Sequence, residues 1–132
     1  QTMKPTIAVA VALVRRDDEW LVALRGPDAH LPNVWEFPGG KLAAHETPEE
    51  AALRELREEC AVEATVTQIL RTITHAYADR IVQLTPVVCR WVRGLGTPLG
   101  NMACRWVTTA ELPTLPMPAA NATVLALLHE AL

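Results

Sequence analysis

Three glutamates near the middle of the chain, Glu55, Glu58 and Glu59, are spaced at i, i+3 and i+4. At about 100° per residue, this spacing puts all three on one face of a helix. Holding like charges together costs on the order of 1 kcal/mol per pair in water, so a compensating cation is expected. Carboxylates suit Mg²⁺ or Mn²⁺, ions that commonly neutralise substrate phosphates. The spacing therefore indicates a candidate site for phosphate chemistry, and the alternative is a solvated acidic surface helix.

The helix that carries these glutamates has a well-defined expected start. Thr47 suits the N-cap, Pro48 suits the first helical position, and Glu50 can reach back to complete a capping box. The sequence therefore predicts a helix that begins at Pro48, with Arg54 paired to Glu58 one turn later. Its core side is expected to consist of Leu53, Leu56 and Cys60.

A Gly-Gly pair precedes the helix and completes a longer pattern. From Gly40 the spacing is G-x5-E-x7-R-E-L-x-E-E-x-A-V, which resembles the signature of the Nudix hydrolase family, G-x5-E-x7-R-E-U-x-E-E-x-G-U with U aliphatic. Every specified position matches except Ala61, where the family has Gly. A left-handed residue is common just after a helix, and Ala there costs roughly 1 kcal/mol or shifts the helix end. We expect a small loss of stability and an intact site.

The resemblance implies roles for individual residues of this pattern. The implied ligands of Mg²⁺ (or Mn²⁺) are Glu55, Glu58, Glu59 and the Gly39 carbonyl. Glu55 is the implied base that activates water, with Glu58 as the alternative, and Arg54 completes the implied catalytic set by orienting the glutamates through ion pairs. Glu46 is implied to be structural, because it would tie the preceding loop to the helix.

The flanking segments are similar to those of the MutT-like branch of the family, which sanitises oxidised guanine nucleotides. The segments are residues 25–30, 33–40 and 116–121. The resemblance implies nucleotide contacts by Arg25, His30, Glu36, Phe37, Pro38, Gly39 and Asn121. Asn121 is the implied base-recognition residue, since an amide donates and accepts hydrogen bonds at once.

Several of these nucleotide contacts have a plain structural explanation as well. Arg25 ends an apolar run and can be simply solvated, and His30 can be an ordinary surface histidine. Phe37 is the only Phe and can belong to the core. Asn121 can cap the final helix, since Asn is a good N-cap and an apolar run follows it.

One segment departs from the MutT-like pattern. Such enzymes often supply a further acidic residue from a loop in the second half of the chain, but residues 94–104 contain no Asp or Glu. Hydrolysis is therefore expected to depend on the glutamates of the helix. Asn101 is a candidate to bind a water molecule, free or metal-bound, in that loop.

Composition agrees with a small enzyme that acts on free nucleotides. The chain has 132 residues, half of them apolar, which suits one domain over residues 1–132. A net charge of −3 does not indicate the basic surface that binds polymeric nucleic acid. The three cysteines, Cys60, Cys89 and Cys104, are unclustered in sequence and lie in apolar stretches, so we expect reduced core thiols.

The start of the chain and its hydropathy bear on location. Gln1 and Thr2 are interpreted as residues left from cloning ahead of Met3, with no signal-peptide pattern. No apolar run reaches about 18 residues, the minimum for a membrane helix. We therefore expect a cytoplasmic protein without membrane contact, as a monomer or homodimer.

The pattern of apolar runs predicts an α/β (α+β) fold, a mixed β-sheet sandwiched between helices, as the Nudix resemblance also implies. A strand buried on both faces is predicted at residues 6–15, and it forms a hairpin with a second strand at 20–25. Apolar and polar residues alternate from Val62 to Val66, and further strands are predicted at 68–75, 80–92 and 104–108. A loop is expected at 94–100, a helical turn at 109–112 and a closing helix at 121–132.

The expected activity is Mg²⁺-dependent pyrophosphohydrolysis of a nucleoside triphosphate to the monophosphate and pyrophosphate. By resemblance the substrate is an oxidised purine nucleotide such as 8-oxo-dGTP, and the role is nucleotide pool sanitation in support of DNA repair. Two different functions stay open: hydrolysis of another nucleotide, such as CTP or a nucleoside diphosphate derivative, and non-catalytic recognition of a nucleotide or base.

Overall fold

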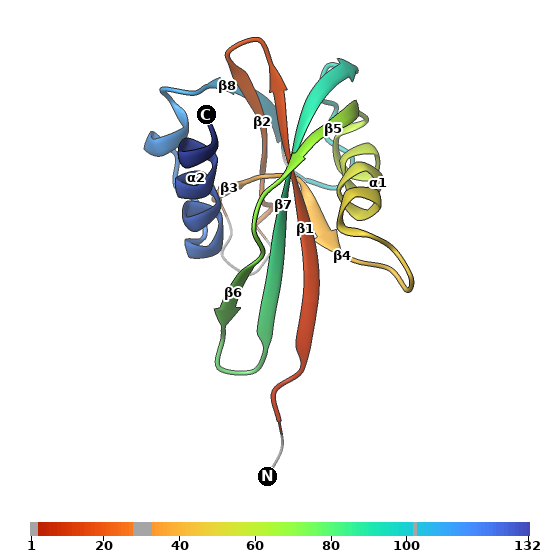
Figure 1. Ribbon diagram of the computed structural model, residues 1–132. Coiled ribbons are helices and arrows are strands. Elements are labelled where there is room, and N and C mark those ends of the chain that lie inside the picture. The colour runs from red at the N-terminus through yellow and green to blue at the C-terminus, as the bar shows by residue number, and fades with distance from the viewer. Residues whose placement is uncertain (1–2, 28–32, 102) are drawn as a thin grey trace.

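A mixed β-sheet runs through the molecule and separates two helices (Figure 1). The structure is a computed structural model that describes residues 3–27, 33–101 and 103–132. In chain order its elements are β1 (Thr6–Arg16), β2 (Glu19–Leu24), β3 (Trp35–Glu36), β4 (Gly39–Lys41), α1 (Pro48–Cys60), β5 (Glu63–Ile69), β6 (Ile73–Ala76), β7 (Ile81–Arg93), β8 (Ala103–Thr108), a 3₁₀ turn (Leu112–Thr114) and α2 (Ala119–Ala131). The predicted arrangement of a mixed sheet between helices is confirmed.

The centre of the sheet is a parallel pair formed by β1 and β7. Their register runs from Thr6 opposite Ile81 to Arg15 opposite Arg90. The other strand pairs in the described residues are antiparallel, with β2 and β4 on β1, β3 and β8 on β2, and β5 and β6 on β7. The expected hairpin of the first two strands is β1 and β2.

The middle of β1, residues 10–14, is buried on both faces because its side chains alternate between the two helices, whereas residues 6–9 are exposed or half-buried, so the predicted burial holds only for the centre of the strand. Ala10, Ala12 and Val14 pack in the cluster around α1. Val11 and Leu13 pack in the cluster around α2. Two of the three residues on the face towards α1 are alanines, so the helix can lie close to the sheet, and its glutamates lie beside Gly39 and Gly40 of β4.

Helix α1 begins and ends as the sequence predicts. Thr47 is the N-cap, and both hydrogen bonds of the capping box with Glu50 are present. Ala61 closes the helix in the left-handed conformation, with φ 54° and ψ 40°. The core side differs slightly from prediction: Leu56 and Cys60 are fully buried, as are Ala51 and Ala52, whereas Leu53 is only partly buried at the margin of the cluster.

The predicted strand at 68–75 is wrong, because the chain forms two strands there. β5 pairs with the second half of β7 up to Ile69 opposite Val87, and β6 pairs with the first half from Ile73 opposite Leu84. Between these halves lies Pro86, which has no N–H to donate, so the antiparallel ladder cannot continue past it.

Two further boundaries differ from prediction at the C-terminal end. The helical turn is a 3₁₀ turn at Leu112–Thr114 rather than at 109–112, and α2 starts at Ala119, after Pro118 at the N-cap. Helices α1 and α2 have 13 residues each. Within the described ranges, none of the helices is long and apolar enough to cross a membrane.

Candidate active site

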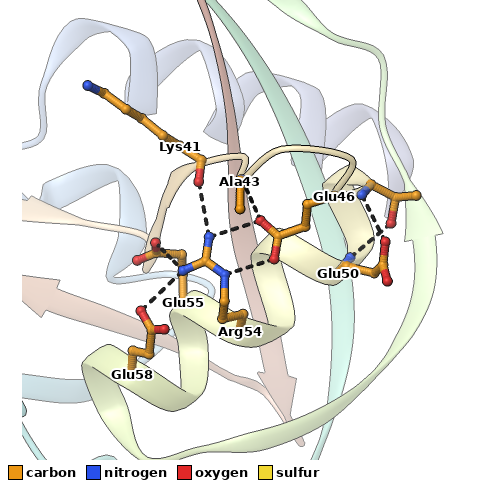
Figure 2. Close-up of polar contacts among 8 residues, drawn as sticks. Lys41, Ala43, Glu46, Glu50, Arg54, Glu55 and Glu58 are labelled. Carbon is orange, nitrogen blue, oxygen red and sulfur yellow. Dashed lines mark hydrogen bonds and ion pairs between the residues drawn. The ribbon is translucent and has the colours of Figure 1, made fainter.

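Arg54 lies between the loop before α1 and the glutamates on its outer face (Figure 2). Its Nε and Nη2 donate to the two carboxylate oxygens of Glu46, at 2.8 and 2.9 Å, and Nη2 also donates to the carbonyl of Lys41. Its Nη1 donates to Glu55 at 2.9 Å and to Glu58 at 3.1 Å. The predicted Arg54–Glu58 pair is confirmed. This set of acceptors raises the pKa of Arg54 further above its usual range and fixes the direction of two site carboxylates.

Glu46 ties the loop to the helix, as expected. Its carboxylate accepts hydrogen bonds from Arg54 and, at 2.8 Å, from the Ala43 amide. These hydrogen bonds, the one from Arg54 first, lower the pKa of Glu46 to about 2. The carboxylate is therefore charged at neutral pH, and the loop is held against α1.

Glu59 is partly buried and sits beside Glu55. Its Oε2 accepts a hydrogen bond from the Gly39 amide at 2.9 Å. Burial, and then the nearby charge of Glu55, raise the pKa of Glu59 to about 8. Two carboxyl groups are thus held together at a place where a second negative charge is unfavourable, which is the electrostatic setting that a cation relieves.

Gly39 presents its backbone to these carboxylates. It lies opposite Val11 in the antiparallel pairing of β1 with β4. The hydrogen bonds of this pairing flank it: on one side the Ala12 amide donates to the Pro38 carbonyl, and on the other the Leu42 amide donates to the Ala8 carbonyl. Such a position is not hydrogen-bonded to the neighbouring strand, so the N–H and C=O of Gly39 both point away from β1. Its N–H already meets Glu59, and its carbonyl faces the same side, in keeping with the expected role as a ligand.

The complete set of three glutamate ligands expected from the sequence is not assembled. No group of three His, Cys, Asp or Glu side chains in the described part of the chain is arranged to hold a metal ion. Glu55 and Glu59 form a pair, whereas the side chain of Glu58 is 59% exposed and lies against Arg54. Arg54 is the cation that attracts Glu58 here. The remaining oxygen donors, two carboxylates and the Gly39 carbonyl, fit a hard divalent cation such as Mg²⁺ or Mn²⁺.

A cavity of about 210 Å³ lies next to Gly39 and Gly40. Of the implied nucleotide contacts, five line it: Arg25, Glu36, Phe37, Gly39 and Asn121. Pro38 does not line the cavity: it is buried elsewhere, and its carbonyl accepts a hydrogen bond from the Ala12 amide in the sheet. His30 lies outside the described residues.

Asn121 lines this cavity and is held by a hydrogen bond from the backbone. It is only 7% exposed, and its Oδ1 accepts a hydrogen bond from the Phe37 amide at 3.0 Å. The N-cap of α2 is Pro118, so the expectation that Asn121 caps this helix is wrong. The Oδ1 of Asn121 is engaged by the Phe37 N–H, which fixes the orientation of the side-chain amide.

Arg25 and Phe37 are each held in place by neighbouring residues. Arg25 is not simply solvated, because its Nε forms an ion pair with Glu36 across the β2–β3 pair, and both side chains line the cavity. Phe37 does belong to the core, with 2% exposure, and it also lines the cavity. The cavity therefore combines a fixed ion pair, an aromatic wall and an oriented amide.

Tyr77 and Arg80 also line the cavity, although the sequence did not predict them as site residues. They flank the turn between β6 and β7, and the Arg80 guanidinium lies 5.6 Å from the centre of the Tyr77 ring. The Nε of Arg80 is buried without a hydrogen-bond partner in the described structure. A buried donor of this kind needs an acceptor, which water or a ligand in the cavity can supply. The one signal in the sequence is the chain's only Tyr, followed three residues later by an Arg.

The loop without acidic residues docks on the C-terminal end of α1. The Leu99 amide and the Asn101 side-chain amide both donate to the Glu59 carbonyl, at 2.9 and 3.1 Å. The Thr97 amide donates to the Cys60 carbonyl at 2.8 Å. Asn101 therefore satisfies a helix-end carbonyl, and the conjecture that it holds water in the site is not supported.

A larger cavity, of about 770 Å³, lies near the β1–β2 turn and the end of α2. Its walls include Arg15, Asp17, Trp20 and Arg90. None of the helix glutamates or nucleotide contacts described above lines it, so cavity size alone does not locate the candidate site.

Comparison with known proteins agrees with this geometry. Residues 9–127 match the family described as NUDIX domain. The chain is 33% identical over 124 residues to the 8-oxo-dGTP diphosphatase of Escherichia coli (strain K12), which covers 91% of this chain and 94% of that protein. It is 37% identical over 78 residues to the CTP pyrophosphohydrolase of the same organism, which covers 59% of this chain and 58% of that protein.

A solved structure shows the same fold. The solution NMR structure of DNA mismatch repair protein MutT (family Nudix hydrolase) from methicillin-resistant Staphylococcus aureus 252 superimposes with a TM-score of 0.74 at 35% identity, covering 97% of this chain and 99% of that one. The expected fold class is thereby confirmed. With a family match over most of its length and the same arrangement of sheet and helices, the chain belongs to the Nudix hydrolase family.

Proposed function

We propose that this protein is a Mg²⁺-dependent nucleoside triphosphate pyrophosphohydrolase that releases pyrophosphate and a nucleoside monophosphate. The observation that carries the proposal is the pair Glu55 and Glu59, held beside the Gly39 backbone at the edge of the cavity that contains Asn121. In this proposal the two carboxylates hold the cation that binds the phosphates, and the adjacent cavity of about 210 Å³ receives the base. A metal site without such a pocket would support only a general phosphatase.

The proposed roles follow from where each side chain points. Glu55, Glu59 and the Gly39 carbonyl would hold the cation, with Glu58 joining them from its exposed position. When bound, the cation neutralises charge that develops on the phosphates and lowers the pKa of water. Glu55 takes the proton from the attacking water, with Glu58 as the alternative base. Arg54 keeps these carboxylates oriented through its hydrogen bonds.

The proposed substrate is an oxidised purine triphosphate such as 8-oxo-dGTP. Asn121 is fixed by the Phe37 amide, so its own amide nitrogen is available to donate to the edge of a base. The identity to the 8-oxo-dGTP diphosphatase of Escherichia coli extends over most of both chains, which supports this class.

A second candidate is a pyrimidine triphosphate such as CTP. It is supported by the 37% identity to the CTP pyrophosphohydrolase of Escherichia coli, although this identity covers 59% of the chain. The helix glutamates are common to both candidates, so the choice between them depends on the cavity.

The test is a panel of canonical, oxidised and sugar-linked nucleotides assayed with Mg²⁺ for release of pyrophosphate and monophosphate. The proposal predicts the highest kcat/KM for an oxidised purine triphosphate. The highest value for CTP would select the second candidate, and binding without turnover on any nucleotide would point to a recognition module.

Metal binding is tested separately from turnover. Calorimetric titration with Mg²⁺ is expected to show uptake by the wild type and strongly weakened uptake by Glu59→Gln. Glu49→Gln removes one charge from the first turn of the same helix and is the matched control, with uptake and turnover unchanged. Equal Mg²⁺ affinity in Glu59→Gln and Glu49→Gln would contradict the proposed ligand set.

A further inference from the structure

Two cysteines that are far apart in sequence meet at the end of α1. The sulfur atoms of Cys60, the last residue of α1, and Cys104, in β8, are 3.1 Å apart. The pairing of β8 with β2, and the docking of α1 on the same face of the sheet, bring these thiols together although they are unclustered along the chain. All three cysteines are free thiols in this structure.

The two thiols differ in their access to solvent. Cys60 is fully buried, whereas Cys104 is partly exposed, and its sulfur also approaches the Asn101 side-chain oxygen at 3.6 Å. The remaining thiol, Cys89, is buried and contacts the Val87 carbonyl. A small oxidant in solution would therefore reach Cys104 first, with Cys60 immediately behind it.

We propose that Cys60 and Cys104 are a reversible redox site, which hydrogen peroxide converts to a disulfide that clamps the end of α1 to β8. In the first step the Cys104 sulfur attacks one peroxide oxygen, the O–O bond breaks, and a sulfenic acid and water form. In the second step the Cys60 sulfur attacks the Cys104 sulfur and displaces hydroxide, which takes the remaining thiol proton to give a second water. The peroxide is reduced by two electrons and the thiol pair is oxidised by two.

The short distance between the two sulfur atoms permits the second step. An S–S bond is about 2.05 Å long, so the sulfurs need to approach by only about 1 Å. The clamp would close a loop that contains β5, β6 and β7 and would join the helix end that carries Glu59 to the sheet. A cross-link over this length of chain restricts the unfolded state, so oxidation is expected to raise the stability of the fold.

The test treats the full chain with a small excess of hydrogen peroxide and then blocks remaining thiols with an alkylating agent. Intact mass spectrometry should show a monomer lighter by two hydrogen atoms, and peptide mapping should show Cys60 linked to Cys104. The Tm is expected to rise by roughly 5–10 °C and to return after treatment with dithiothreitol. These measurements are independent of the proposed hydrolytic activity.

Variants identify the thiols that are used. Cys89→Ala is the control and should still form the link, while Cys104→Ser should not gain stability on oxidation. The proposal is overturned if peptide mapping of the oxidised wild type finds Cys104 only as a sulfinic acid, or only in a link between two chains. A linked monomer with an unchanged Tm would overturn the clamp.

Discussion

The carboxylate of Glu55 occupies the space that a side chain at Gly40 would need. A Cβ placed at Gly40 would lie 2.7 Å from the carboxyl carbon of Glu55. Gly39, one residue earlier, is restricted by different atoms: a Cβ there would lie 2.2 Å from the Ala10 carbonyl oxygen and 2.8 Å from the Val11 Cα. A side chain at Gly40 is therefore expected to disturb the site, and a side chain at Gly39 is expected to disturb the fold.

Gly40→Ala is expected to reduce turnover with little change in stability. The obstructing group is the end of a flexible side chain, so Glu55 can swing away, but it then leaves its place beside Glu59. A displacement of about 1 Å at a catalytic group commonly costs roughly 10- to 100-fold in rate. Steady-state kinetics and a urea denaturation curve on the same variant measure the two effects.

Gly39→Ala is the contrasting variant. Its Cβ would meet backbone atoms of β1, which cannot move without disturbing the sheet. We expect a loss of roughly 1–3 kcal/mol in the free energy of unfolding. If Gly40→Ala is the more destabilising of the two, or retains full activity, this division between the glycines is wrong.

Ala61→Gly is expected to stabilise the fold. Ala61 has φ 54°, a left-handed conformation that costs an L-residue roughly 1 kcal/mol and that Gly adopts freely. Part of this gain is offset because Gly makes the unfolded chain more flexible, so the net gain is about 0.5 kcal/mol. The free energy of unfolding in urea measures it. Ala43→Gly, in an exposed loop without positive φ, is the control and should show no gain.

Asn121→Ala is expected to affect both the fold and substrate choice. It leaves the buried Phe37 N–H without an acceptor, which costs about 1–3 kcal/mol of stability. It also removes the proposed donor to the base, so the KM for purine triphosphates should rise more than the KM for pyrimidine triphosphates. An equal rise for all nucleotides would mean that Asn121 only supports the Phe37 backbone.

Glu46 is expected to make stability depend on pH in the acid range. Its pKa is lowered from an ordinary 4.5 to about 2 in the folded protein, so between these values the unfolded chain binds more protons. The contribution of Glu46 is therefore complete above about pH 4.5 and disappears as the pH falls to 2. The difference in Tm between the wild type and Glu46→Gln should be largest near neutral pH and should shrink as the pH falls through this window. A difference that is constant over the whole range would show that the charge of Glu46 is not responsible.

The features predicted well from sequence are those that nearby residues determine. The capping box at Thr47, the left-handed Ala61 and the Arg54–Glu58 pair all depend on residues within a few positions of each other. Propensity and hydrogen bonding along the chain suffice for such features, so the face of α1 that carries the glutamates is predictable.

The features that sequence patterns do not predict depend on contacts across the sheet. The break between β5 and β6, around Leu70, lies opposite Pro86 in β7. The sequence of β5 and β6 alone therefore gives no sign of it. Arg80 lines the cavity because the pairing of β7 with β1 brings the turn before β7 beside Val9 and Val11, and local patterns carry no sign of that register. Cys60 and Cys104 meet for the same kind of reason.

The parallel pairing of β1 with β7 has a consequence for how the chain acquires its structure. The strand that starts the sheet finds its central partner some 75 positions later, so most of the polypeptide must be synthesised before the sheet can close. Pairings of such long sequence separation are slow to form. A nascent or truncated chain that stops before β7 is expected to leave the apolar faces of β1 and α1 uncovered, and thus to be prone to aggregation.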